Sequence, residues 1–309
     1  MQIKYGTDVK NIDVTNICFN KLFQNNIITI PAGELNRSYY FTDPIYGISK
    51  KIIIIINDDI IEYDYNQTII ININNQTITT QNIINILNNN PNITIQNINY
   101  IDAKTEEIQS KLKINYGSFM EELPEQKMVV RYLTGSEKVL EIGSNIGRNS
   151  LIIASIIDNN NFLSLESDTT IFNQLNENKN LNNFTFYTEN SALSNKKLIQ
   201  NGWVTIPSDN LLPGYKWVNT ITLSELYSKY NIQFDTLVLD CDGVFYYILM
   251  NMPEILNNIK LIIMENDYLN ISEKNYIDNV LKNNNFYVDY VESGGWGPCY
   301  NNFYEVWKK

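Results

Sequence analysis

The stretch that decides the fold is KVLEIGSNIGRNSLIIA, residues 138–154. Its first half is an apolar run that ends in an acid, Glu141, and a turn with two glycines, Gly143 and Gly147, follows. Its second half carries apolar residues at helical spacing. This order predicts a buried strand, a tight turn and a helix, which is how an α/β unit begins.

The same alternation continues toward the C-terminus. Helical patterns separate further candidate strands, which are NFLSLE (161–166), FTFYTE (184–189), DTLVLD (235–240) and IKLIIME (259–265). Short apolar runs between helices are typical of buried parallel strands. The last two runs, NNFYVDYVES (284–293) and NNFYEVWKK (301–309), lie close together in the sequence, so they predict an antiparallel pair at the edge of the sheet.

Residues 1–103 have a different character. Short Ile-rich and aromatic runs with turn residues between them predict a smaller β-rich accessory domain, and we place the domain boundary between residues 103 and 104. Residues 81–99, QNIINILNNNPNITIQNIN, are low in complexity and are interpreted as more strands or as a loosely ordered connection. Self-association into a homo-oligomer is one role that we consider for this domain.

Composition excludes several classes of function. The net charge is −11, which disfavours binding to nucleic acid or to an anionic membrane surface. The chain has no histidine, which removes Ser-His and Cys-His catalysis, and its three cysteines show no metal or disulfide spacing. No secretory signal is visible at the N-terminus, so we expect a soluble cytoplasmic protein. The excess of Asn and Ile is typical of AT-rich genomes, and for a large DNA virus the location would be the host cytoplasm.

The glycine turn favours a ligand without a pyrophosphate. A dinucleotide site needs G-x-G-x-x-G, whereas this turn reads E-x-G-x-x-x-G. The second candidate strand ends in Glu166, 25 residues after Glu141, near the offset of a carboxylate that binds ribose hydroxyls. The alternative is ordinary turn chemistry, which is common in α/β proteins.

The order of these segments resembles the class I S-adenosylmethionine-dependent methyltransferases, and within that class the FkbM-type family. The resemblance covers residues 116–309 and rests on LEIGSNIG, SLES, SALS, DCDGVF and IIMEND. It implies a Rossmann-like seven-stranded sheet with an antiparallel C-terminal strand pair, and O-methylation of a sugar, nucleotide-sugar or glycan hydroxyl. The chain departs from the family pattern at Phe245, where the family has an acid, and at Ser224, where it has Asp.

The resemblance also implies a set of site residues. S-adenosylmethionine would be bound by Glu141, Gly143, Ser144, Asn145, Gly147, Glu166, Ser191, Ala192 and Asp240. In this set Glu166 would bind the ribose hydroxyls, Ser191 and Ala192 would lie against the adenine, and Asp240 would close the site.

The base for a hydroxyl acceptor must come from the remaining titratable groups. Asp240, Asp242 and Glu265 lie at or just after the ends of candidate strands, where open α/β sheets bind ligands, and we interpret them as catalytic. Asp267 lies nearby, and helix capping is the alternative role for Asp242 and Asp267. Two such carboxylates are also compatible with a Mg²⁺ ion, because hard cations prefer oxygen ligands.

Aromatic residues in two candidate loops suggest an acceptor site. Residues 201–219 carry Trp203, Tyr215 and Trp217, and residues 292–302 carry Trp296. Aromatic faces pack on sugars, although they also anchor surface loops to a core. Two other functions stay open from the sequence: an inactive methyltransferase-like binding or assembly module, and a nucleotide-sugar enzyme of another class.

Overall fold

The computed structural model describes residues 1–45, 47–57 and 59–309, which form two compact units, Met1–Asn88 and Asn89–Lys309. Among the described residues, no helix has the length and apolar character needed to cross a membrane.

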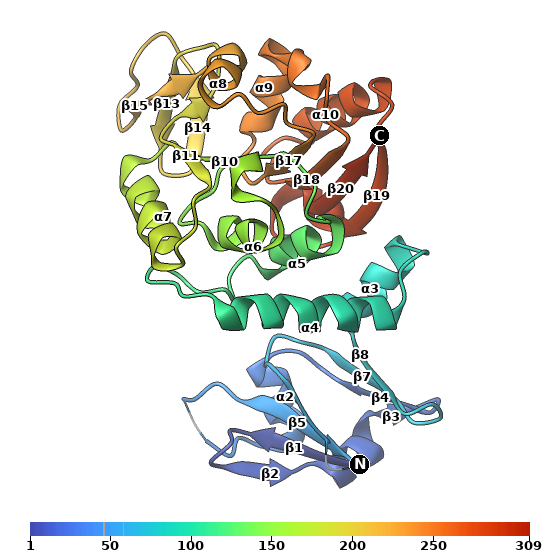
Figure 1. The fold of residues 1–309 in the computed structure, drawn as a ribbon. Helices are drawn as coiled ribbons and strands as arrows, with labels where there is room; N and C mark the ends of the chain where they lie inside the picture. The colour runs from blue at the N-terminus through green and yellow to red at the C-terminus, as the bar shows by residue number, and fades with distance from the viewer. Residues whose placement is uncertain (46, 58) are drawn as a thin grey trace. The chain divides into compact units, whose positions relative to one another are not determined.

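The first unit is built from two antiparallel sheets, of order β2-β1-β5-β6 and β3-β4-β7-β8 (Figure 1). Alternate isoleucines of the strands, among them Ile52 and Ile54 of β5, point into one shared apolar core with Tyr5 and Phe41. The β-rich N-terminal region expected from the sequence is therefore present. The elements of this unit are β1 (Gln2–Gly6), β2 (Asn11–Asp13), α1 (Thr15–Ile17), η1 (Cys18–Leu22), β3 (Phe23–Gln24), β4 (Ile27–Ile30), α2 (Glu34–Phe41), β5 (Lys51–Ile56), β6 (Asp59–Tyr63), β7 (Ile69–Asn72) and β8 (Thr77–Thr80).

The interpretation of residues 81–99 as strands or a loose connection was wrong, because they form helix α3 (Gln81–Asn89) and the start of α4 (Ile95–Lys111). The residues that α4 buries, Ile98, Ile101 and Thr105, recur at helical spacing. A capping box at Thr94 begins the helix. The boundary placed between 103 and 104 falls inside α4, whereas the structure divides the chain at 88 and 89.

The second unit is organised around a seven-stranded sheet of order β11-β10-β9-β17-β18-β20-β19. The first five strands in this order run parallel, and β20 and β19 are antiparallel to their neighbours. This is the predicted Rossmann-like sheet with its antiparallel C-terminal pair. The strands are β9 (Val139–Ile142), β10 (Phe162–Leu165), β11 (Tyr187–Glu189), β17 (Thr236–Leu239), β18 (Leu261–Glu265), β19 (Tyr287–Glu292) and β20 (Tyr304–Lys308).

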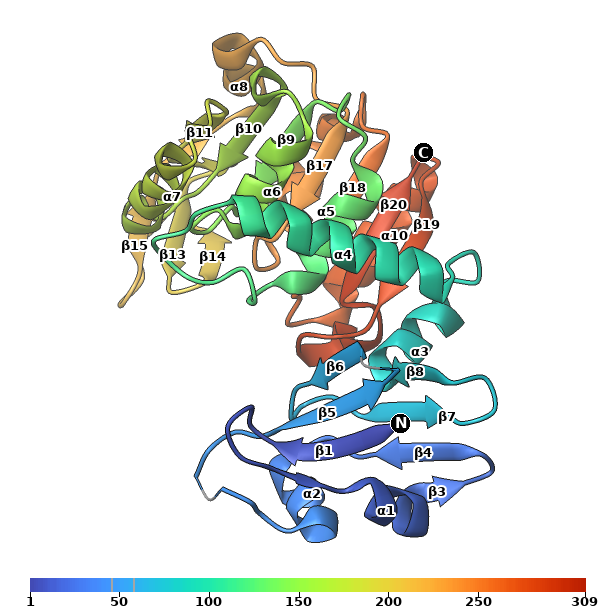
Figure 2. The ribbon, with the colours of Figure 1, turned by 60° about the horizontal axis from the view of Figure 1, so that its bottom comes forward.

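Helices cover both faces of this sheet (Figures 1 and 2). On one face α8, α9 and α10 pack on a large apolar core with strand residues such as Leu140 and Leu237. On the other face lie α5 and α6, and α4 packs against both of them. The helical segments of this unit are α4, α5 (Leu123–Tyr132), α6 (Arg148–Ile156), η2 (Asn159–Asn161), α7 (Thr169–Leu181), α8 (Leu223–Tyr230), α9 (Val244–Asn251), η3 (Pro253–Leu256), α10 (Ile271–Asn283) and η4 (Gly297–Asn302).

Residues 201–219, interpreted as a long loop, contain strand segments as well as turns. They contribute to a small antiparallel sheet of order β14-β13-β15, with β13 (Leu198–Asn201), β14 (Val204–Pro207) and β15 (Lys216–Val218). Two short strands, β12 (Ala192–Leu193) and β16 (Thr220–Ile221), pair in parallel beside it. Turn residues such as Pro213 and Gly214, which lie between β14 and β15, favoured the interpretation as a loop.

Candidate active site

A cavity of about 410 Å³ lies in the second unit, at the carboxyl ends of β9, β10 and β17. This is the edge at which open α/β sheets bind ligands, and the volume is that of a small-molecule site. Eight of the site residues predicted from the sequence line it: Gly143, Asn145, Glu166, Ser191, Ala192, Asp240, Asp242 and Glu265.

Gly143 lets two loops meet at the floor of the cavity. Its φ is +86°, and a Cβ built on it would lie 1.6 Å from the backbone oxygen of Asp240. Next to it Asn145 also has a positive φ, of 50°. The glycine therefore allows the turns after β9 and β17 to approach more closely than a side chain would permit.

Glu166 lies at the end of β10, with its carboxylate bound to two backbone amides. Oε2 accepts a hydrogen bond of 3.0 Å from Asn145 N, and Oε1 accepts one of 2.7 Å from Asp168 N. Burial raises the pKa of Glu166 to about 7, against the two amides, which lower it. Each oxygen retains a lone pair for a ligand hydroxyl, since a carboxylate has about four acceptor positions.

Three of the predicted residues do not line the cavity. Glu141 is buried under α6, where Oε2 accepts hydrogen bonds from Ser150 Oγ at 2.5 Å and Ser164 Oγ at 2.7 Å. The reason is strand alternation: Leu140 and Ile142 point to the core on one face, so Glu141 must point to the other. Burial raises the pKa of Glu141 to about 7.

Ser144 and Gly147 also lie behind the cavity wall. Ser144 Oγ donates a hydrogen bond of 3.1 Å to the backbone oxygen of Leu165. Gly147 has a φ of +91°, and a Cβ there would come within 2.5 Å of Leu175 Cδ1. These two residues shape the loop, and a direct contact with a cofactor stays a prediction for them and for Glu141.

Ser191 and Ala192 follow β11, on the side of the cavity away from Asp240. Ser191 is buried, and its hydroxyl donates a hydrogen bond of 3.3 Å to Glu189 Oε1. Both residues line the cavity, and their contact with an adenine stays a prediction.

Carboxyl groups gather at the opposite end of the cavity. Asp240 follows β17, Glu265 ends β18, and one oxygen of each lies within 4.8 Å of one from Asp267. Asp267 Oδ1 accepts a hydrogen bond of 2.9 Å from Gly243 N at the start of α9. Asp267 thus binds this helix terminus, and the N-cap residue of α9 is Gly243 rather than Asp242.

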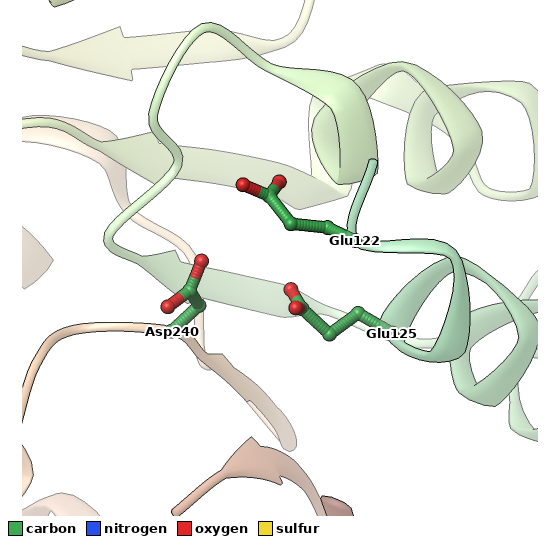
Figure 3. Close-up of side chains that lie close together, drawn as sticks. All are labelled: Glu122, Glu125 and Asp240. Atoms are coloured by element: carbon green, nitrogen blue, oxygen red, sulfur yellow. The ribbon is translucent and has the colours of Figure 1, made fainter. Parts of the chain in front are cut away.

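Two members of this group were not predicted from the sequence. Glu122 precedes α5 and Glu125 lies in its first turn, and both point toward Asp240 (Figure 3). One oxygen from each of the three residues lies within 4.8 Å of the others. The signal was the acid-rich start of a helix, MEELPEQ, but nothing local showed that it faces the end of a strand more than a hundred residues later.

Burial among other acids raises the pKa values of the whole group. The pKa of Asp240 lies well above its ordinary range, first because of burial and then because of Glu265 and Asp267. The pKa of Glu125 is raised in the same way by burial, Asp240 and Glu265. The pKa values of Glu265, Asp242 and Asp267 are also raised, in each case first by burial.

Two tryptophans complete the cavity. Both Trp203, between β13 and β14, and Trp296, before η4, line the cavity. The side chain of Trp203 is 60% exposed and that of Trp296 is 48% exposed. Tyr215 and Trp217 are not among the lining residues. An apolar surface open to solvent therefore lies on the same cavity as the acids.

No family model matches this chain, and no curated protein matches it. Three solved structures show limited likeness to this chain. One is an O-methyltransferase from Bacillus cereus in complex with SAH, with 11% identity, 70% of this chain and 90% of that chain covered, and a TM-score of 0.35. The others are fibrillarin from Aeropyrum pernix with natively bound S-adenosyl-L-methionine (10% identity, 78% of this chain and 92% of that chain, TM-score 0.35) and a methyltransferase from Pyrococcus furiosus (12% identity, 69% of this chain and 96% of that chain, TM-score 0.36). At these TM-scores the likeness decides nothing about function, and the fold described above rests on strand order and direction.

Proposed function

We propose that this chain is an S-adenosylmethionine-dependent methyltransferase that acts on a hydroxyl group. The observation that supports this most is one cavity that joins the glycine turn after β9, the acid after β10 and the acid after β17. Glu166 would accept hydrogen bonds from the ribose hydroxyls, Gly143 would let the backbone approach the cofactor, and Ser191 and Ala192 would contact the adenine.

The acids at the other end would serve the acceptor. In the transfer, the acceptor oxygen attacks the methyl carbon, the bond from that carbon to sulfur breaks, and S-adenosylhomocysteine leaves. The hydroxyl proton must pass to a base, and the sequence contains no histidine. Asp240 and Glu265 line the cavity, and either carboxylate would accept that proton there.

A sugar, nucleotide-sugar or glycan is the acceptor class that we propose. Trp203 and Trp296 present exposed aromatic faces on the cavity, and such faces pack on the apolar faces of sugar rings. The net charge of −11 favours an acceptor without a run of phosphates.

The test is transfer of a labelled methyl group to a panel of sugar and nucleotide-sugar acceptors at saturating cofactor. We expect Asp240→Asn to lower the rate at least ~100-fold, the usual scale for loss of a general base. Asp8→Asn is the matched control, since it makes the same change at an exposed carboxylate of the first unit and should transfer at the normal rate. Turnover near normal in Asp240→Asn would remove Asp240 as the base.

A further inference from the structure

The three carboxyls at the start of α5 and the end of β17 converge on one point. Glu122, Glu125 and Asp240 point toward one another from two elements, and one oxygen from each lies within 4.8 Å of the other two (Figure 3). We propose that these three side chains bind a divalent cation. The inference goes beyond methyl transfer and does not require it, because the site is defined by the ligands alone.

The spacing fits a hard divalent ion. Carboxylate oxygens lie roughly 2.3–2.6 Å from Ca²⁺, so two oxygens on opposite sides of the ion are at most about 5 Å apart. The oxygens of the triad fall within that separation. For Mg²⁺, at roughly 2.1 Å from its ligands, the limit for two opposite oxygens is tighter, about 4.2 Å.

Glu125 supplies an independent sign of a missing partner. Its side chain is 4% exposed, and Oε1 accepts no hydrogen bond from an N–H or hydroxyl donor among the described residues. The group within hydrogen-bond reach of this carboxyl is another acid, Glu265, and two such acids in contact need a shared proton or a cation. A buried carboxylate oxygen without a partner is costly, so proteins rarely retain one without a ligand. In Figure 3 this carboxylate points at Asp240, into the centre of the triad.

The charged groups around Glu125 and Asp240 are mainly acidic. Within the part of the chain that the structure describes, no Lys or Arg pairs with Glu125 or Asp240, and Arg148 reaches only the rim, at 2.8 Å from Glu122. The charged groups that act on Glu125 are the carboxyls of Asp240, Glu265 and Glu122. A cation with a single charge would leave most of this group uncompensated, whereas a divalent ion with oxygen ligands offsets it.

The test is a titration of Mn²⁺ into the full chain after removal of metals with a chelator. Calorimetry and the loss of the free Mn²⁺ signal in electron paramagnetic resonance give the stoichiometry, with no cofactor or acceptor present. We expect one saturable site, and a fall in affinity of at least tenfold in Glu125→Gln. Glu141→Gln is the matched control, because that carboxyl is equally buried but lies outside the triad, and it should bind Mn²⁺ as the unaltered chain does.

Asp267→Asn separates this site from the neighbouring acids, and we expect it to keep the affinity within a few-fold. Circular dichroism shows which variants fold, and Asp240→Asn replaces Glu125→Gln should the latter be unfolded. Absence of a saturable site, or equal affinity in the unaltered chain and Glu125→Gln, would overturn the proposal. In that case protons shared between the carboxyls compensate the charge of the cluster. Loss in Asp267→Asn with no loss in Glu125→Gln would also overturn the assignment. Methyl transfer is not measured in any of these experiments, so their failure leaves the proposed function standing.

Discussion

Gly143 and Asp240 belong to different loops, yet a Cβ on the glycine would meet the Asp240 backbone oxygen at 1.6 Å. This contact joins the turn after β9 to the turn after β17 and fixes the floor of the cavity. Asp240 N donates a hydrogen bond of 3.1 Å to the Ile142 backbone oxygen beside it.

Gly143→Ala should therefore be strongly destabilising. A non-glycine residue at this φ costs roughly 1–3 kcal/mol, and the clash with a backbone atom adds a similar amount. Gly202→Ala is the control, since Gly202 also has a positive φ but a Cβ there would meet nothing within 4 Å. Urea unfolding measures both variants, and an equal loss of stability in the two would show that the close approach contributes little.

Glu166→Gln should weaken S-adenosylmethionine binding by about 1–3 kcal/mol, since hydrogen bonds to charged groups are of that order. The amide keeps the shape but has only one acceptor oxygen, while the carboxylate also holds the backbone amides of Asn145 and Asp168. Glu166→Ala removes both of these contacts, so it should loosen the loop as well and is the less specific variant. Calorimetry gives the affinity, and an unchanged value in Glu166→Gln would remove this carboxylate from the cofactor site.

The raised pKa of Glu141 predicts that the chain loses stability as the pH rises. Burial raises its pKa from 4.5 to about 7, so the folded chain holds this proton where the unfolded chain has lost it. The contribution of protonated Glu141 to the free energy of unfolding is thus fully present below pH 4.5. It is lost as the pH rises through about 7, and the total loss is roughly 2–4 kcal/mol.

The check is urea unfolding at pH 5 and pH 8, in the presence of a chelator. Other acids shift in the same direction, so the comparison is between the unaltered chain and Glu141→Gln, whose amide can still accept from Ser150 and Ser164. We expect stability to fall less with pH in the variant. The same fall in both chains would show that Glu141 does not hold a proton in the folded state.

Truncation tests the division of the chain. Residues 89–309 should fold alone, because α4 packs on α5 and α6 within the second unit. A chain beginning at residue 105 loses buried Ile98 and Ile101, and at roughly 1.5–3 kcal/mol each it should be about 3–6 kcal/mol less stable. Thermal unfolding of the two chains measures the difference, and equal stability would show that α4 contributes little to this unit.

The sheet could be predicted from the sequence because its signals are local. Each strand is a short apolar run next to a helix with its own periodicity, and Glu166 and Asp240 lie in register with strand ends. The side on which Glu141 lies could not be predicted, since a strand places alternate residues on opposite faces and the acid alone does not reveal which face carries the ligand.

The contribution of α5 to the site depends on tertiary structure. Glu125 and Asp240 are far apart in the sequence and meet only because α5 packs beside β18. Residues 81–99 were predicted wrongly for another reason. Asn and Ile have low helix propensity, but the stripe of residues that α4 buries outweighs that preference.

Calorimetric titration of S-adenosylmethionine into the purified full chain tests the central claim most directly. We expect saturable binding of one cofactor per chain, with weaker binding in Glu166→Gln and normal binding in Asp8→Asn. Absence of saturable binding at millimolar cofactor, in a chain shown to be folded, would contradict the assignment of the cavity at the ends of β9, β10 and β17 as a cofactor site.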